Sequence, residues 1–404
     1  MRARILSSVD PQLVQRFYIL AYLLFILKYL CQPSLLVPWP GYIDVAVSSL
    51  FIAMVLIKIA LQHFTAPQIL GFIAVSVLCV YSSVNAHYSS PMLSLLLVMA
   101  LQDVDLRDVL RAGYRFKAVI ILIHVICYIA LIIVSPDSVV YLYRGGVARH
   151  FFLLGHPNLF TTLVVWTCLE YIYVNYDRIR AIHYAAILLV NIVIYRFTDS
   201  RSGFYTLIIV VVFAFFDKLN FRPMRTVANA LAKYGFGVLS VLSIALTVVY
   251  TPEISGRARV LWLKLNELLT GRLVFGAYAY HDFGFTWLGR ALTFPEKVLY
   301  NSHWFDDVIF DNSYQWFVVV YGGIFLVIIA LAFFFNAKRM TVIEKIIISA
   351  FSIFALMENY TVNVAVCFPL LLIGKCIFSQ RREDEETIKI TGEETVPLWK
   401  RKSA

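Results

Sequence analysis

The sequence predicts an all-α fold: a polytopic transmembrane helix bundle with a partly helical loop domain on one side. Hydrophobic residues make up 60% of the 404 residues, and only 15% are charged. The mean hydropathy of +0.77 lies far above that of a water-soluble globule. Apolar stretches of about 20 residues, long enough to cross about 30 Å of hydrocarbon, recur from end to end. We therefore expect one bundle of about 12 helices in a bilayer.

The apolar stretches define the expected helices in order. These lie near residues 17–36, 42–62, 66–85, 90–103, 117–136, 158–175, 180–197, 203–217, 230–251, 312–335, 342–358 and 361–378. The first stretch follows Arg2 and Arg4 but has no small-residue cleavage site, so we interpret it as a retained helix and not a signal peptide. The chain then divides into transmembrane helices 1 to 9 with short outer loops (1–251), a large extracytoplasmic loop (252–311), transmembrane helices 10 to 12 (312–378) and a charged cytoplasmic tail (379–404).

The basic residues predict the orientation of the bundle. With the N-terminus inside, every inward connection is basic, as the positive-inside rule requires. These connections hold Arg107, Arg111, Arg115, Lys117, Arg178, Arg180, Lys218, Arg222, Arg225, Lys338, Arg339 and Lys345. Both termini are then cytoplasmic, and the segments 135–157, 197–202 and 251–311 face outward. Because the basic residues are scattered over short turns, the net charge of +10 does not indicate nucleic-acid binding.

Several well-known chemical motifs are missing from the sequence. It contains no HExxH, Walker A, GxSxG or dinucleotide-binding motif. Its six cysteines fall in apolar stretches without a CxxC spacing, so neither structural disulfides nor a zinc site are expected. We expect no cofactor and no metal.

One outward loop carries two arginines and leads into a helix. Arg144 and Arg149 flank a pair of glycines, and Gly155-His156-Pro157-Asn158 follows. A helix that begins at Pro157 would direct unpaired backbone N–H groups outward, which favours phosphate, and arginine forks bind phosphate oxygens bidentately. The alternative is a loop anchored at the interface by Arg and Tyr, with His156 acting as a helix cap.

A second cluster occupies the tight outward turn between two helices. Asp199-Ser200-Arg201-Ser202-Gly203, with Arg196 just before it, places Arg201 at the membrane boundary. An outward arginine in a short turn runs counter to the orientation bias, which indicates an anionic partner. In the alternative interpretation, the side chain only reaches up to the lipid headgroups.

The long outer loop offers further cations. Its charges are mixed and interleaved with aromatic residues, a composition that suits a sugar surface or the headgroup layer. Arg272 stands within Thr270-Gly271-Arg272-Leu273, and Arg257 and Arg290 are nearby in the sequence. One of these arginines could complete a pyrophosphate clamp, although loop arginines are often only solvated.

A carboxylate precedes the next long apolar helix. Asp311-Asn312-Ser313-Tyr314 leads into a stretch that contains Tyr321-Gly322. Asp, Asn and Ser are preferred helix caps, so capping alone could account for the motif. A carboxylate held at a helix start beside arginines could also act as a general base toward a sugar hydroxyl. Glu358, at the outward end of the following helix, offers a second carboxylate.

Taken in order, these motifs resemble those of the bacterial O-antigen and exopolysaccharide polymerases and the O-antigen ligases. The matching pieces are Gly155-His156-Pro157-Asn158, Ser200-Arg201-Ser202-Gly203, Thr270-Gly271-Arg272-Leu273, Asp311-Asn312-Ser313-Tyr314 and Tyr321-Gly322. Ligases of this superfamily have a His-Asn-Ser type motif where this chain has Asp311-Asn312-Ser313. That departure favours the polymerase branch and leaves His156 and His303 as substitutes for the ligase histidine.

The resemblance implies a GT-C-like membrane glycosyltransferase in the bacterial cytoplasmic membrane, acting on its outer side. It implies an undecaprenyl-pyrophosphate-linked oligosaccharide as substrate, with the lipid bilayer and a polysaccharide chain-length regulator as further partners. Transfer would be inverting and metal-independent, because arginines stabilise the departing pyrophosphate while a base deprotonates the acceptor hydroxyl. By the family pattern, Arg201 and Arg272 hold the pyrophosphate.

The candidate site residues fall into three groups. The catalytic candidates are Asp311, His156 and Glu358; the pyrophosphate-binding candidates are Arg201, Arg272, Arg144, Arg149, Arg196 and Arg257; the substrate-binding candidates are Asn158, Asn312, Tyr314 and His303. Two alternatives remain open: a ligase that passes the glycan to another acceptor, and a transporter or flippase for a lipid-linked sugar. A transporter needs polar residues at mid-membrane depth, where the helices offer little beyond Lys28, His124 and Glu170.

Overall fold

The computed structural model describes residues 10–144, 146–250, 256–269, 271–293, 298–300, 303–305 and 310–379, without the side chains of 256–258, 298–300 and 303–305. Within these ranges the chain is a bundle of helices with two short antiparallel hairpins. Strand β1 (Leu142–Arg144) pairs with β2 (Val147–Arg149), and β3 (Val298–Tyr300) pairs with β4 (His303–Phe305).

The helices follow one another along the chain. They are α2 (Pro11–Cys31), α3 (Gly41–Ala60), α4 (Ala66–Ala86), α5 (Ser90–Met99), α6 (Leu106–Val134), α7 (Pro157–Asn175), α8 (Ala181–Thr198), α9 (Arg201–Lys218), α10 (Arg222–Ala230), α11 (Phe236–Val249), α12 (Gly256–Leu268), α13 (Arg272–Phe283), α14 (Ser313–Trp316), α15 (Gly323–Asn336) and α16 (Val342–Phe354). A last apolar helix covers Pro369–Ser379. Two π-helical turns, η2 (Leu231–Gly235) and η3 (Phe317–Tyr321), continue α10 into α11 and extend α14.

Six helices of the described chain are long and apolar enough to cross a membrane. These are α2, α3, α4, α6, α8 and the continuous helix Arg222–Val249. The mostly helical fold expected from the sequence, with apolar helices long enough to span a membrane, is therefore present, whereas the count of 12 spanning helices is not confirmed. Helix α6 starts at Leu106 and not near residue 117, because the Asp105 side chain accepts a hydrogen bond from the Arg107 backbone N–H and caps it.

The expected helix 312–335 is interrupted at Gly322. Its φ of +112° favours glycine, and an added Cβ would lie 2.4 Å from the Trp287 carbonyl oxygen. A segment of the long outer loop packs into this break: the Thr286 N–H donates to the Val318 carbonyl at 2.7 Å, and the Gly323 N–H donates to the Thr286 carbonyl at 2.8 Å. The Tyr321-Gly322 motif thus docks part of the outer loop onto the bundle.

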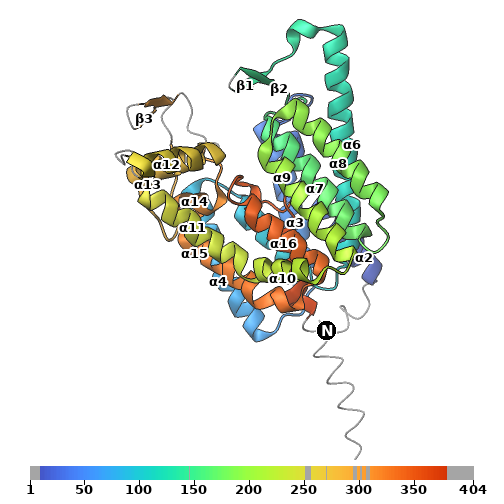
Figure 1. Cartoon of the computed structure of the whole chain (residues 1–404). Coiled ribbons are helices and arrows are strands. Elements are labelled where there is room, and N and C mark those ends of the chain that lie inside the picture. Colours follow the sequence, from blue (N-terminus) through green and yellow to red (C-terminus); the bar gives the residue numbers. More distant parts are fainter. Residues whose placement is uncertain are drawn as a thin grey trace, which may run out of the picture.

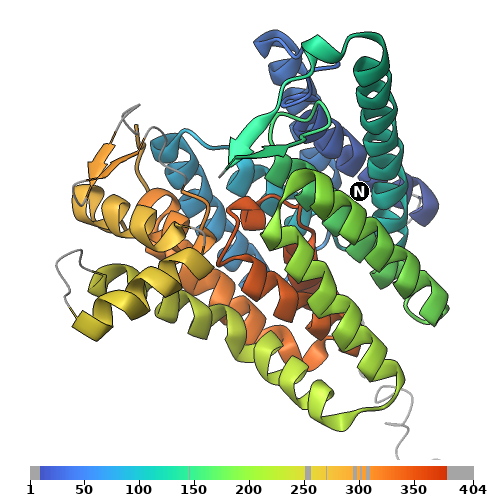
Figure 2. The ribbon, with the colours of Figure 1, turned by 45° about the horizontal axis from the view of Figure 1, so that its top comes forward.

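The C-terminal part of the chain lies at the centre of the bundle. Figure 2 shows this segment, in red, surrounded by the green helices α8 and α9, the yellow helices of the middle of the chain and the blue N-terminal helices. Helix α16 packs against α9, α10 and η2. The residues after α16 are therefore enclosed by segments from most of the chain.

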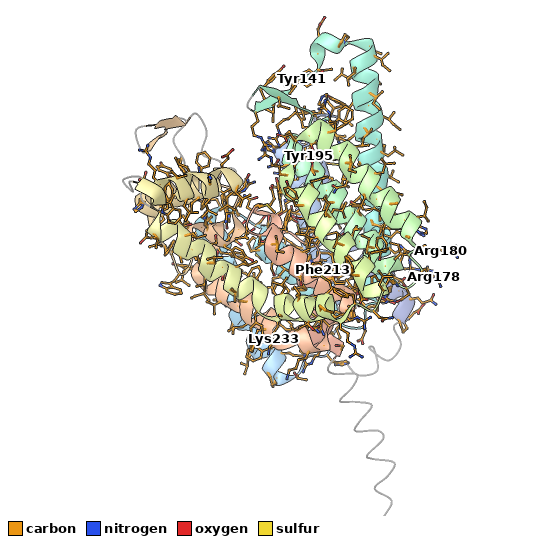
Figure 3. The ribbon with its side chains drawn as sticks, in the orientation of Figure 1. Tyr141, Arg178, Arg180, Tyr195, Phe213 and Lys233 are labelled. Carbon is orange, nitrogen blue, oxygen red and sulfur yellow. The ribbon has the colours of Figure 1, made fainter. Side chains whose placement is uncertain are left out.

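The two ends of the bundle differ in their side chains. Figure 3 shows Arg178 and Arg180 at the end of the bundle away from Tyr141 and Tyr195. Figure 1 shows the β1–β2 hairpin, α12 and α13 at the end where Tyr141 and Tyr195 lie. The segments expected to face outward thus share one end, opposite the basic turn between α7 and α8.

A buried ion pair joins three helices inside the bundle. The Lys117 Nζ in α6 lies 2.6 Å from Glu170 Oε1 in α7, and both side chains are fully buried. The Tyr22 hydroxyl in α2 donates to the same carboxylate oxygen at 3.4 Å. Breaking such a pair by removing one partner typically costs about 3–5 kcal/mol, because it leaves the other charge buried and unpaired.

A close helix contact sets the position of the turn before α9. Gly203 lies in the first turn of α9, and a Cβ built there would lie 2.6 Å from Cγ2 of Thr161 in α7. The Thr161 hydroxyl in turn donates to the Thr198 hydroxyl at the end of α8, at 2.9 Å. Glycine therefore allows α9 to approach α7 closely, which holds the polar turn 199–202 against the bundle.

Replacing Gly203 with Ala should destabilise the protein by about 1–3 kcal/mol, because the added methyl group overpacks the contact with Thr161. Gly71→Ala in α4 is the matched control, since nothing lies within 4 Å of its added carbon. It should leave the stability unchanged or raise it slightly. Thermal unfolding of the detergent-solubilised variants compares the two, and equal midpoints would contradict the close packing.

Candidate functional site

The candidate site forms around an irregular segment buried inside the bundle. The sequence predicts a helix over 361–378, but the last helix begins at Pro369, and residues 355–368 form turns and the short 3-10 helix η5 (Tyr360–Val362). Residues 361–369 are all buried. Non-helical backbone at membrane depth is tolerated only where protein encloses it or where it lines a cavity. Such a segment commonly marks a functional site.

Side chains from distant parts of the chain satisfy this buried backbone. The Arg272 Nε donates to the Met357 carbonyl at 2.6 Å, and the Ser313 hydroxyl donates to the Glu358 carbonyl. The Tyr22 hydroxyl donates to the Val364 carbonyl at 3.3 Å. Each bond replaces one that a continuous helix would have made, so the irregular path is stabilised by the surrounding helices.

Glu358 is the centre of the polar cluster. Its side chain is 1% exposed, and the Ser202 hydroxyl donates to Oε1 at 2.5 Å. The Arg272 Nη2 lies 3.4 Å from the same oxygen and 3.5 Å from Oδ2 of Asp311. One guanidinium group therefore bridges both candidate carboxylates. Arg272 is itself only 8% exposed and is placed by Gly271, whose φ of +84° favours glycine before α13.

A second buried arginine comes from the β1–β2 hairpin. Arg149 is 6% exposed; its Nε donates to the Thr198 carbonyl at 2.8 Å and its Nη2 donates to Oδ1 of Asn158 at 2.6 Å. Arg144, at the other strand of the hairpin, forms an ion pair with Asp199 at 2.5 Å. The hairpin thus carries two guanidinium groups to the turn between α8 and α9, beside the start of α7.

Burial and neighbouring charges shift the acid–base behaviour of these groups. Burial, together with the charge of Asp311, raises the pKa of Glu358 to about 8 despite the opposing effect of Arg272. Burial also raises the pKa of Asp311, which Arg272 and Arg149 partly offset. Near neutral pH the carboxylate pair therefore holds a proton. Burial, and the charges of Arg144 and Arg272, lower the pKa of Arg149 to about 10.

His156 caps a helix. It is the N-cap residue of α7, and its Nδ1 accepts the Asn158 backbone N–H at 3.1 Å. Burial and the charges of Arg149 and Arg144 lower its pKa to about 4, so the ring is neutral near pH 7. Because Nδ1 is occupied as an acceptor, Nε2 carries the proton and can donate but not accept one. The capping alternative is the one that the geometry supports.

Asn312 and Tyr314 also have structural partners. The Asn312 side chain accepts the backbone N–H groups of Tyr314 and Gln315 at the start of α14, and its amide donates to the Ser243 hydroxyl at 3.0 Å. Tyr314 is fully buried, and its hydroxyl donates to the Ser352 carbonyl at 2.6 Å. Tyr314 therefore packs α14 against α16 and does not line the site, contrary to its expected role as a substrate contact.

Two further arginine candidates, Arg201 and Arg196, are not brought into the cluster. Arg201 and Arg196 are both exposed, and no hydrogen bond or ion pair links either to the cluster in the part of the chain that the structure describes. Arg201 is the first residue of α9, next to Ser202. The side chains of Arg257 and His303 lie outside the described residues. Of the two arginines expected to hold the pyrophosphate, Arg272 is thus buried and Arg201 is exposed.

The sequence interpretation did not single out Ser202 or Asp199 as site residues. Ser202 contacts Glu358 directly, and Asp199 holds Arg144. Both belong to the run Asp199-Ser200-Arg201-Ser202-Gly203, and the signal that could have indicated them is the density of polar residues between two apolar helices. In this run the contacts with the cluster are made by Ser202 and Asp199, the neighbours of the predicted arginine.

The cluster suits an anion better than a metal ion. Arg149 and Arg272 present donors in a buried setting, where a charge-assisted hydrogen bond to a phosphate oxygen is strong. Among the described residues no group of three or more His, Cys, Asp or Glu side chains is placed to hold a metal ion. The arrangement places two guanidinium groups, which suit an anion, near a carboxylate pair.

Comparison with models of protein families finds no matching family for this chain. Comparisons with curated proteins and with solved structures likewise find no match.

Proposed function

We propose that the chain is a membrane glycosyltransferase that joins oligosaccharide repeat units carried on a polyprenyl diphosphate such as undecaprenyl pyrophosphate. The observation that carries this proposal is the contact of Arg272 with both Glu358 and Asp311, inside an apolar bundle and near Arg149. Buried cations beside a titratable carboxylate pair suit a reaction with an anionic leaving group and a hydroxyl that loses a proton.

The proposed step is a single displacement at the anomeric carbon. The acceptor hydroxyl oxygen attacks that carbon, the bond to the diphosphate oxygen breaks, and its electron pair leaves with the diphosphate. Asp311 takes the hydroxyl proton, because its side chain is 23% exposed and can meet an acceptor, whereas that of Glu358 is 1% exposed. Arg272 and Arg149 stabilise the charge that develops on the diphosphate. Arg201, exposed at the start of α9, meets the diphosphate from the membrane surface.

The proposed location is the outer side of the bacterial cytoplasmic membrane. The β1–β2 hairpin, which carries Arg144 and Arg149, and α13, which begins at Arg272, lie toward one end of the bundle, and Arg178 and Arg180 lie at the other (Figures 1 and 3). The positive-inside rule assigns the end with the basic turns to the cytoplasm. A lipid-linked glycan that has crossed the membrane would then meet the cluster from outside.

The two alternatives differ from this proposal in what they require. A ligase of the same superfamily would use the same cluster but pass the glycan to another acceptor, so the products separate the two. A transporter would need charged groups along an open path at mid-membrane depth. The buried charges of Lys117 and Glu170 are instead fully enclosed and pair with each other, which favours an enzyme.

Arg272→Gln should lower the rate of polymerisation by about 10²–10³, the typical loss for one preorganised donor at a developing anion. The measurement is a product ladder formed by purified protein in liposomes from lipid-linked repeat units. Arg259→Gln is the matched control, because Arg259 is an exposed arginine of α12. An undiminished ladder from Arg272→Gln in correctly inserted protein would refute the role of the cluster.

Asp311→Asn should lower the rate by about 10²–10⁴ while lipid-linked substrate still binds, because the amide cannot accept the hydroxyl proton. Asp137→Asn, at an exposed position near the hairpin, controls for the loss of a negative charge. Single-turnover rates and substrate binding are measured on the same preparations. A variant that turns over at the normal rate would exclude Asp311 as the base.

The rate should fall as the pH rises through about 8, because Glu358 then loses its proton and adds a negative charge beside Arg272. Below that pH the group is neutral and does not repel the diphosphate. Glu358→Gln keeps a neutral hydrogen-bonding side chain and should abolish the fall. A pH–rate profile of both proteins tests this, and a fall of the same size in the variant would assign it to another group.

A further inference from the structure

A cavity is lined by residues that directly follow members of the arginine cluster in the chain. Its volume is about 680 Å³, within the range of about 300–1,000 Å³ that small-ligand sites occupy. The cavity and the arginine cluster are adjacent along the backbone. Asn359 and Tyr360 line the cavity directly after Glu358, and Leu159 lines it directly after Asn158, the partner of Arg149. A ligand in the cavity would therefore lie next to the groups proposed to carry the chemistry.

Aromatic side chains make up one side of the cavity. Tyr88, between α4 and α5, packs edge-to-face on Trp316 of α14 and on Tyr321 of η3, with ring centroids 5.6 and 6.1 Å apart. All three residues line the cavity. Aromatic rings of this kind present large, rigid apolar surfaces with a polar edge, which suits the alternating C–H and hydroxyl faces of a pyranose ring.

The polar side chains of the cavity leave it without a strong net charge. Lys28 and Asp44 both line it and form an ion pair of 2.8 Å, and the Lys28 Nζ also donates to the Ser48 hydroxyl at 2.7 Å. The amides of Asn359 and Asn363 supply further donors and acceptors. The arginine cluster differs, because the hydrogen bonds of Arg149 go to neutral groups, the Thr198 carbonyl and the Asn158 amide, and its positive charge favours a phosphate.

We propose that this cavity binds the neutral oligosaccharide of the acceptor, while the arginine cluster binds the diphosphate of the donor. The inference rests on the proposed function. It adds that the acceptor oligosaccharide and the donor diphosphate bind at separate places, next to the segment that begins at Glu358. Tyr88 and Trp316 stack on the sugar, and the amides of Asn359 and Asn363 bind its hydroxyl groups.

Binding measurements test this without requiring turnover. The probe is the oligosaccharide released by mild acid from the polyprenyl-linked glycans of the source cells, titrated by calorimetry into purified protein in lipid nanodiscs. Tyr88→Ala and Trp316→Phe should each weaken its binding about tenfold, since one removes a stacking surface and the other makes it smaller. Tyr143→Ala is the matched control, because Tyr143 is an exposed tyrosine of β1 outside the cavity.

Inorganic pyrophosphate serves as the second probe. Its binding should be unchanged in Tyr88→Ala and Trp316→Phe but weakened in Arg272→Gln, which separates the two sites. The cavity proposal is overturned if the oligosaccharide does not bind, if both cavity variants bind it normally, or if Arg272→Gln weakens its binding as much as Tyr88→Ala does. Loss of oligosaccharide binding only in the cavity variants, with no pyrophosphate binding to any protein, would support the cavity and refute the proposed function.

Discussion

Burial of the Glu358 carboxylate is the constraint on which the site depends. Removing a carboxylate from water is costly unless it is neutral or surrounded by donors. Glu358 meets that requirement in both ways: its pKa is raised to about 8, and Ser202 and Arg272 approach the same oxygen. Because Ser202 belongs to α9 and Arg272 to α13, the Glu358 carboxylate contacts two regions that lie far from it in the chain. Moving either of them would leave a buried polar group without a partner.

The irregular segment 355–368 follows from the same requirement. A continuous helix would have satisfied the hydrogen bonds of its own backbone, but its regular turn would have fixed the direction of the Glu358 side chain. Here the backbone relies on Arg272, Ser313 and Tyr22 instead. The exchange leaves Glu358 facing the arginines while the next residues, Asn359 and Tyr360, line the neighbouring cavity. One break in a helix therefore serves two sites.

Several residues that the sequence marked for chemistry turn out to organise the backbone. His156 and Asn312 each accept backbone N–H groups at a helix start, and Tyr314 is buried against α16. The reason is that polar residues at the ends of apolar helices must first satisfy the unpaired groups of those ends. Asp311 and Glu358, by contrast, meet at the guanidinium group of Arg272. Helix capping and the proposed proton transfer therefore fall to neighbouring residues of the same motif.

The sequence by itself determined the helical class, the apolar spans and the four polar clusters between them, because hydropathy and local composition depend on neighbouring residues only. It also named Arg272, Arg149, Asp311 and Glu358 as candidates. Only the tertiary structure decided that Arg149 and Arg272 are buried while Arg201 is exposed, that Ser202 is the partner of Glu358, and that helix 361–378 begins eight residues late. These outcomes depend on contacts between separate segments, such as Ser202 and Glu358, which lie 156 residues apart, and no local pattern encodes them.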